Sequence, residues 1–255
     1  MAGSSQVSIL NKPRKRRLKV TRKEQVSPGM LRVILAGEDL ADFPADRESA
    51  NFKLILPSKD SAPVVRTYSV RSFDESALEL AVDFYRHSEA GPGSQWAASV
   101  AIGEAIEIAG PGPAKFVDFT ADWFLFAGDM SALPAISANI ERLPSDATGY
   151  AVFEIESSED IQSLKFPEGM QVNWLVRTQG RQPCEQLIEA VRACDWRLGR
   201  PAVWLAGESG AVRTLRRYFK EERGVERSDL YASGYWQLGL TEDAHQKIKR
   251  QSADS

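Results

Sequence analysis

The spacing of apolar residues along the chain changes character near residue 119. Before that point, short segments alternate apolar and polar residues between turns rich in Pro, Gly, Asp and Ser. An alternation with period two is typical of half-buried β-strands, and several short strands at even spacing favour an antiparallel barrel or sandwich. The pattern predicts strands at residues 31–37, 52–57, 64–70, 77–87 and 104–110.

After residue 119, apolar runs alternate with segments of helical period. Strands that alternate with helices imply βαβ units and a parallel sheet. We therefore predict two domains. A six-stranded-type antiparallel β-barrel occupies residues 14–118, and a parallel α/β nucleotide-binding domain with a C-terminal helical segment occupies residues 119–255. The expected strands of the second domain are 123–128, 149–157, 171–178 and 201–209, and its expected helices are 131–143, 184–196 and 210–224.

Charge and composition exclude few classes of function. The 255 residues carry 35 acids and 32 bases, so no overall positive field recommends nucleic acid as a partner. One basic run, residues 12–19, stands out. It is either a solvated strand edge or a cationic arm for nucleic acid or membrane, and its direct continuation into an alternating segment favours the strand edge.

The apolar runs are far shorter than a membrane-spanning helix, which needs about 20 residues. Residues 1–10 lack the basic and apolar regions of a secretory signal, so we expect a cytoplasmic protein without membrane insertion. We also expect a monomer. Cys184 and Cys194, with only two histidines in the chain, predict neither a disulfide framework nor a metal site. Both cysteines are expected to be ordinary thiols on one helix.

Two strand ends of the α/β half share a pattern. "AGDMSALPAI" starts at residue 127 and "AGESGAVRTL" at residue 206, and each opens a helix with a small residue, a glycine and an acid. Amide groups at such an edge suit a pyrophosphate or a nicotinamide ring. The alternative is a tight strand-to-helix turn that needs glycine.

The barrel half supplies further candidate chemistry in "RTYSVR", residues 66–71. Strand alternation sends Arg66 and Tyr68 to one face, and Thr67 and Ser69 to the other. Guanidinium binds phosphate through paired hydrogen bonds, a tyrosine ring stacks on a flat heterocycle, and a serine hydroxyl reaches a ring nitrogen.

The segment "GPGSQWA", residues 91–97, predicts a second anion site. Gly91 and Gly93 permit a close backbone approach, and Ser94 is expected to cap a helix that starts there. A helix start preceded by glycines is suited to a phosphate, although a capped surface helix would give the same pattern.

Together these motifs resemble the siderophore-interacting protein family, whose members are flavin-dependent ferric-siderophore reductases of the ferredoxin reductase-like superfamily. R-x-Y-S alone marks the superfamily. The joint pattern "DFYRH", "GPGSQWA", "AGDMSALPAI" and "GYW" is more specific, and the resemblance extends from about residue 15 to "GYWQLGLTEDAHQKI".

The resemblance implies an FAD in the barrel, a ferric siderophore as substrate and no metal held by the protein. Arg66 would bind the pyrophosphate, Tyr68 would pack on the flavin ring, and Ser69 would bond the ring near N5. Lys53 would steer the siderophore. The chain departs from many relatives at Met130 and at residues 237–239, where relatives carry arginine, so Lys247 and Lys249 are the candidates for the missing positive charge. The remaining residues that the resemblance assigns to the cofactor are Thr67, Asp83, His87, Gly91, Pro92, Ser94, Trp96, Asp129, Ala132, Leu133 and Trp236.

The source of electrons is a separate question. Glu154 and Glu156 follow the second α/β strand, where an acid favours a ribose diol over a ribose phosphate, so NADH is preferred over NADPH. A ferredoxin is the alternative donor. Two further functions stay open: an iron-handling module that binds siderophores without turnover, and a superfamily flavin reductase with another acceptor.

Overall fold

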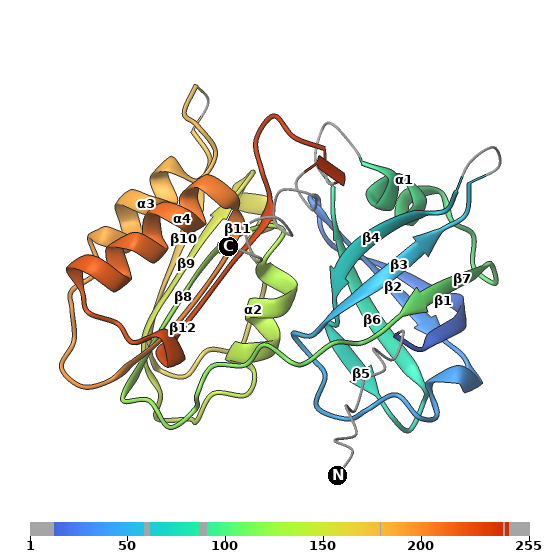
Figure 1. The fold of residues 1–255 in the computed structure, drawn as a ribbon, viewed down its shortest axis with the longest axis horizontal. Helices are drawn as coiled ribbons and strands as arrows, with labels where there is room; N and C mark the ends of the chain where they lie inside the picture. Colours follow the sequence, from blue (N-terminus) through green and yellow to red (C-terminus); the bar gives the residue numbers. More distant parts are fainter. Residues whose placement is uncertain (1–12, 59–61, 87–90, 179, 242, 245–255) are drawn as a thin grey trace, which may run out of the picture.

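The computed structural model describes residues 13–58, 62–86, 91–178, 180–241 and 243–244. Within these ranges the chain forms two sheets that lie side by side, each with its own helices (Figure 1). The predicted change of domain between residues 118 and 119 falls in the connection from the last strand of the first sheet to the first strand of the second.

The first sheet is antiparallel throughout and confirms the predicted architecture of the N-terminal half. It has seven strands, in the order β4-β3-β7-β1-β2-β6-β5. The short β5 at the end of this order lies outside the strands predicted from the alternation. The strands are β1 (Lys15–Ser27), β2 (Met30–Ala36), β3 (Asn51–Leu56), β4 (Val64–Ser69), β5 (Ser72–Asp74), β6 (Glu79–Tyr85) and β7 (Ala105–Ala109).

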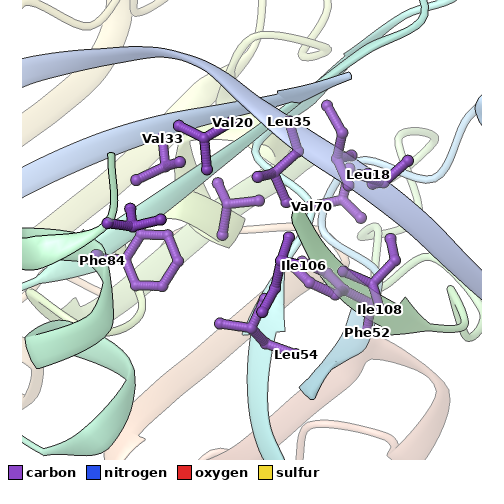
Figure 2. Packing of buried hydrophobic residues seen from close by; sticks show 14 of the residues in the cluster. Leu18, Val20, Val33, Leu35, Phe52, Leu54, Val70, Phe84, Ile106 and Ile108 are labelled. Atoms are coloured by element: carbon purple, nitrogen blue, oxygen red, sulfur yellow. The ribbon is translucent and has the colours of Figure 1, made fainter. Parts of the chain in front are cut away.

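Alternate residues of these strands form the barrel core, shown in Figure 2. Strand β1 illustrates the pattern, because Leu18 and Val20 are buried while Lys15, Arg17 and Lys19 between them are exposed. The alternation that predicted the strands is therefore the one that fills the core.

The basic run forms part of a strand, as its alternation favours. Strand β1 lies between β7 and β2, and Arg16 is buried, with its guanidinium donating to the carbonyl oxygens of Asp39 and Gly110. Residues 15–18 pair with β7 alone, because β2 pairs with β1 only from Lys19 onward, so this part of β1 has one side outside the strand ladder, as predicted. Lys12 lies outside the described residues.

The second sheet is parallel, in the order β10-β9-β8-β11-β12. Its strands are β8 (Trp123–Asp129), β9 (Thr148–Ile155), β10 (Gly169–Val176), β11 (Pro201–Glu208) and β12 (Leu230–Trp236). Strand β12 carries Tyr, Ser and Gly in place of a continuous apolar run, so hydropathy did not reveal it.

Helices cover both faces of the parallel sheet. Helix α2 (Leu133–Ile140) lies on the face toward the barrel, and α3 (Glu185–Arg192) and α4 (Ser209–Arg217) lie on the other face (Figure 1). The barrel half contains one helix, α1 (Pro92–Ser99). Short turns complete the described chain: η1 (Glu38–Leu40), η2 (Ser158–Asp160), a π-helical turn η3 (Tyr218–Glu222) and η4 (Arg227–Asp229).

Buried polar contacts join the two halves. Asp160 is buried, and its Oδ1 accepts from Ser27 Oγ and from Gly29 N in the β1–β2 turn, each at 2.7 Å. Arg71 donates to Glu141 at the end of α2, with Nη1 2.9 Å from Oε2. The barrel is therefore held against the face of the sheet that α2 covers.

The strand order also gives the parallel sheet a switch point. The order of the strands in the sheet changes direction at β8: β9 and β10 lie on one side of it, and β11 and β12 lie on the other. In open parallel sheets, ligands bind beyond the carboxyl ends of the strands at this switch point. Here those ends are Asp129 and Glu208.

Candidate functional site

Strand β4 carries the R-x-Y-S residues beside strand β3. Tyr68 pairs with Phe52 and Arg66 with Leu54, whereas Thr67 pairs with Lys53. Phe52 and Leu54 are core residues, so Arg66 and Tyr68 share the inner face of the barrel sheet. Thr67 and Ser69 lie on the opposite face, together with Lys53 and Asn51, and Ser69 Oγ is 3.5 Å from Asn51 Oδ1.

Arg66 of the R-x-Y-S motif is buried, with 8% of its surface exposed. Its Nη1 lies 2.9 Å from Oδ1 of Asp243, and its Nη2 lies 3.4 Å from Oδ2. The Asp243 side chain is 76% exposed, so the ion pair is formed at the surface by the C-terminal segment. The guanidinium thus already binds two oxygens of one anionic group, which is the geometry that a phosphate uses.

Tyr68 connects β4 to α1. The centroid of its ring lies 4.4 Å from that of Phe84, and the centroid of Phe84 lies 5.6 Å from that of Trp96 in α1. A Cβ added to Gly93 would lie 2.0 Å from the Tyr68 hydroxyl. Gly93 is therefore required because the tyrosine hydroxyl occupies the space where a side chain would lie.

Helix α1 starts at a different residue from the one predicted. Helix α1 begins at Pro92 with Gly91 at the N-cap, and no side chain makes a capping hydrogen bond. Ser94 lies inside the first turn, and its hydroxyl donates to Gly91 O at 3.0 Å. The helix starts earlier than expected because Pro92 favours the first helical position. The first-turn amides consequently have no side-chain cap among the described residues, as an anion site requires.

Asp83 lies in an ion-pair chain on the outer face of the barrel sheet, because its neighbours Val82 and Phe84 fill the core. Its carboxylate accepts two hydrogen bonds from Arg32, at 2.6 and 2.8 Å, and Arg71 Nε lies 3.8 Å from Oδ2. Arg71, which the sequence left without a role, continues the chain to Glu141. Asp83 is thus engaged by two arginines, and direct contact with a flavin stays a prediction.

At the carboxyl edge of the parallel sheet, acids accept hydrogen bonds from backbone amides of the strand-to-helix turns. Asp129 Oδ1 accepts from Ser131 N at 2.9 Å, and Glu208 Oε2 accepts from Ala211 N at 2.8 Å. The repeated glycine-acid pattern therefore builds two strand-to-helix turns, but only Glu208 caps its helix, α4, whereas Asp129 binds the turn before α2 and leaves α2 without a side-chain cap. Gly207 makes room for this arrangement, since a Cβ there would lie 2.4 Å from Asp129 Oδ2.

Asp129 is the centre of this edge. Its Oδ2 accepts from Trp236 Nε1 at 2.8 Å and from Glu208 N at 2.9 Å, and Cys184 Sγ lies 3.7 Å away. Burial raises the pKa of Asp129, against the lowering effect of Ser131 and Trp236. Trp236 therefore meets Asp129, while Ala132 and Leu133 are buried where α2 begins.

Glu154 is a second buried acid at this edge. Its Oε1 accepts from Cys184 N at 2.8 Å and lies 3.5 Å from Arg177 Nε, and its Oε2 is buried without a hydrogen-bond partner among the described residues. Burial raises the pKa of Glu154. Glu156 accepts from the Tyr85 hydroxyl and pairs with Arg177. Both candidate ribose-binding acids thus already have partners within the chain.

Cys184 and Cys194 are free thiols. Burial raises the pKa of Cys184, and nearby Asp129 and Glu154 raise it further. The two cysteines were predicted to lie on one helix, but they flank it, because α3 is shorter than expected: Cys184 is its N-cap and Cys194 follows its C-cap, Ala193.

Of the remaining predicted residues, the structure describes only Lys53. Lys53 Nζ donates to Thr67 Oγ1 at 2.6 Å on the outer face of β3 and β4. His87, Lys247 and Lys249 lie outside the described residues. In the part of the chain that the structure describes, no cluster of three or more His, Cys, Asp or Glu side chains is arranged to hold a metal ion. Nor does any helix in that part have the length and apolarity needed to cross a membrane.

Comparison with known proteins identifies the family. The family model described as "Siderophore-interacting protein" matches residues 121–239, and that described as "Siderophore-interacting FAD-binding domain" matches residues 19–64 and 57–115. The ferric vibriobactin reductase ViuB of Vibrio cholerae is 35% identical over 90% of this chain and 92% of its own length. This chain belongs to the siderophore-interacting protein family.

Solved structures agree with the sequence comparison. The siderophore-interacting protein SipS of Aeromonas hydrophila superposes with a TM-score of 0.86 at 33% identity, covering 95% of this chain and 99% of its own. The ferredoxin-NADP+ reductase of Plasmodium falciparum superposes with a TM-score of 0.63 at 12% identity, covering 87% and 96%, and shows the shared fold. This chain therefore has an FAD-binding barrel followed by an α/β domain of the ferredoxin reductase-like type.

The described residues fit an FAD. Arg66 binds an anion through two nitrogen atoms, and the first turn of α1 offers uncapped amides near Tyr68. Together with the relatives named as reductases, this supports an oxidoreductase of the siderophore-interacting family.

Proposed function

We propose that this protein reduces ferric siderophore complexes with electrons that pass through a bound FAD, and that ferrous iron leaves the chelator in the cytoplasm. The observation that supports this most directly is Arg66, a buried guanidinium in the FAD-binding barrel that already binds a carboxylate through two nitrogens. ViuB, a similar chain over most of its length, is named as a ferric vibriobactin reductase.

Each candidate residue has a separate task in this proposal. Arg66 and the first-turn amides of α1 bind the pyrophosphate, the Tyr68 ring packs beside the flavin, and Ser69 donates to its polar edge. When bound, FAD takes up electrons in pairs and releases them singly, as ferric iron requires. Hard oxygen ligands hold ferrous iron less strongly, so the chelator then releases it.

For the electron donor we propose NADH. The carboxylates of Asp129, Glu154 and Glu208 place negative charge at the carboxyl edge of the sheet, which disfavours the additional phosphate of NADPH. Glu208 also caps α4, and Asp129 accepts from Ser131 N in the turn before α2, so these two amides are not free for a pyrophosphate. A ferredoxin is the donor to compare, because it needs access only to the flavin edge.

A donor and acceptor assay tests the function. The FAD-loaded protein is reduced anaerobically with NADH, NADPH or reduced ferredoxin, and ferric catecholate, hydroxamate and citrate-type complexes are then added. We expect reoxidation of the flavin with formation of a ferrous-chelator complex. A protein that binds siderophore without a flavin would instead be a binding module, and a reduced flavin that persists until a different acceptor is added would indicate another flavin reductase.

Replacing Arg66 tests the cofactor site. Arg66→Ala removes a charge-assisted contact worth about 1.5 to 3 kcal/mol, so the Kd for FAD should rise roughly 10- to 100-fold. Arg22→Ala is the control, because Arg22 is an exposed arginine of the same barrel that pairs with Glu24. Titration of apoprotein with FAD measures both variants, and an unchanged Kd for Arg66→Ala contradicts the assignment.

Replacing Lys53 tests substrate steering. Lys53→Ala should leave the FAD content unchanged and raise the KM for an anionic ferric siderophore, most strongly at low ionic strength, because exposed charges are screened by salt. Lys19→Ala, on an exposed position of β1, is the control. If the KM of Lys53→Ala keeps the salt dependence of the wild type, Lys53 does not steer the substrate.

A further inference from the structure

The hydroxyl of Tyr235 is a buried polar group without a hydrogen-bond partner among the described residues. Tyr235 belongs to β12, and its ring packs against the apolar cluster between the sheet and α2. A buried hydroxyl that lacks a partner costs free energy, so such groups in native proteins usually serve a ligand or a function.

The backbone singles out the same residue. In the ladder between β11 and β12, Gly207 pairs with Gly234 and Glu208 pairs with Trp236. Tyr235 is therefore the extra residue of a β-bulge. Bulges redirect a side chain and occur next to active sites more often than elsewhere in a sheet.

The bulge brings the tyrosine to the R-x-Y-S strand. The Tyr235 hydroxyl interacts electrostatically with the side chains of Ser69 in β4 and Tyr231 in the same strand, but neither meets the geometry of a hydrogen bond, and burial raises its pKa well above the usual value. The hydroxyl thus keeps its proton and is available as a donor. The neighbouring Trp236 is already engaged, since its Nε1 donates to Asp129.

We propose that Tyr235 is a cofactor-binding residue, whose hydroxyl donates a hydrogen bond to the polar edge of the flavin ring alongside Ser69. This inference rests on the proposed function. It assigns to Tyr235 the cofactor contact that the sequence assigned to Trp236, and it connects the α/β domain to the flavin through β12.

The proposal makes opposite predictions for the two forms of the protein. Without FAD, Tyr235→Phe removes a buried group that has no partner, so the apoprotein should keep its Tm or gain stability. With FAD, the same change removes one hydrogen bond, so the Kd should rise about fivefold. The visible absorption band of bound FAD should also shift, because the ring loses a donor.

Two matched variants accompany the experiment. In Tyr85→Phe the lost hydroxyl has a partner, Glu156, so the apoprotein Tm should fall. Tyr150→Phe removes a hydroxyl from β9 on the opposite face of the sheet, where its ring centroid lies 6.2 Å from that of Trp123, and its FAD affinity and spectrum should match the wild type. Apoprotein Tm is measured by circular dichroism, and FAD binding by fluorescence titration and absorption.

The outcomes separate the two proposals. If the wild type binds FAD and Tyr235→Phe binds it with the same Kd and spectrum, the role of Tyr235 is wrong while the proposed function stands. A lower apoprotein Tm in Tyr235→Phe would show that the hydroxyl has a structural partner, and would also overturn the inference. If the wild type does not bind FAD, the proposed function fails, and this inference fails with it.

Discussion

Three buried carboxylates show how single residues shape the carboxyl edge of the parallel sheet. Asp129, Glu154 and Glu208 each accept a hydrogen bond from a backbone amide at or next to the start of a helix. Such bonds favour the charged form, whereas burial disfavours it. For Asp129 and Glu154, burial is the larger effect and raises the pKa. The charged forms of Asp129 and Glu154 are therefore buried at a cost in stability.

Glu154→Gln tests this cost. Because the pKa of Glu154 is higher in the folded than in the unfolded chain, its contribution is most favourable below the unfolded pKa and declines as pH rises through the folded pKa. The glutamine variant should therefore gain stability over the wild type as pH rises from 4 to 7, by about 1.4 kcal/mol for each unit of the pKa difference.

Denaturant unfolding across this pH range measures the gain. Glu75→Gln, at an exposed position of the barrel, is the control and should follow the wild type at every pH. A constant stability difference between Glu154→Gln and the wild type would show that burial of the acid carries no charge cost.

At the scale of elements, α1 and β4 form a unit. The helix starts at Pro92, and the close approach of Gly93 to the Tyr68 hydroxyl joins its first turn to the R-x-Y-S strand. The predicted phosphate-binding turn and the predicted flavin-packing ring therefore depend on one contact. Either element would be displaced if that contact were lost.

Gly93→Ala tests the contact. The added methyl group overlaps the tyrosine hydroxyl, so the apoprotein should lose about 1 to 3 kcal/mol, and FAD binding should weaken because the helix start moves. Gly91→Ala is the stability control, since Gly91 has an ordinary φ of −75° and open space around its Cα. Thermal unfolding compares the two variants, and equal Tm values would contradict this account of Gly93.

For the whole molecule, the relative position of barrel and α/β domain depends on buried polar contacts. Asp160 accepts from Ser27 and Gly29 of the barrel, and Asn139 of α2 donates to Ser49 Oγ at 3.2 Å. The proposed flavin lies where the two halves meet, so these contacts set the distance between β4 and β12. Loss of one of them should therefore affect both stability and cofactor binding.

Asp160→Ala tests this connection. It leaves the Gly29 amide and the Ser27 hydroxyl buried without their acceptor, at a cost of about 1 to 3 kcal/mol each. We expect the single unfolding transition to broaden or divide into two in calorimetry. Glu159→Ala changes the exposed neighbour of Asp160 and should unfold as the wild type does. An identical calorimetric profile for Asp160→Ala would show that this carboxylate does not couple the halves.

The pattern of the sequence predicted most elements of the fold, because an alternating strand or an amphipathic helix is encoded locally. Residues 31–37, 52–57 and 123–128 became strands for this reason. Strand β12 and its bulge were not predicted, since a partly polar edge strand has no strong period and its register is set by β11.

By itself, the sequence determined the two-domain architecture, the family and the set of candidate residues around R-x-Y-S, because all of these depend on periodicity and on motifs that are continuous in the chain. The tertiary structure alone decided which of these residues meet. It paired Arg71 with Glu141 and Asp83, and it formed the hydrogen bond from Trp236 to Asp129. It also brought the Tyr235 hydroxyl near Ser69. Those contacts join residues far apart in the chain, and local preferences do not specify them.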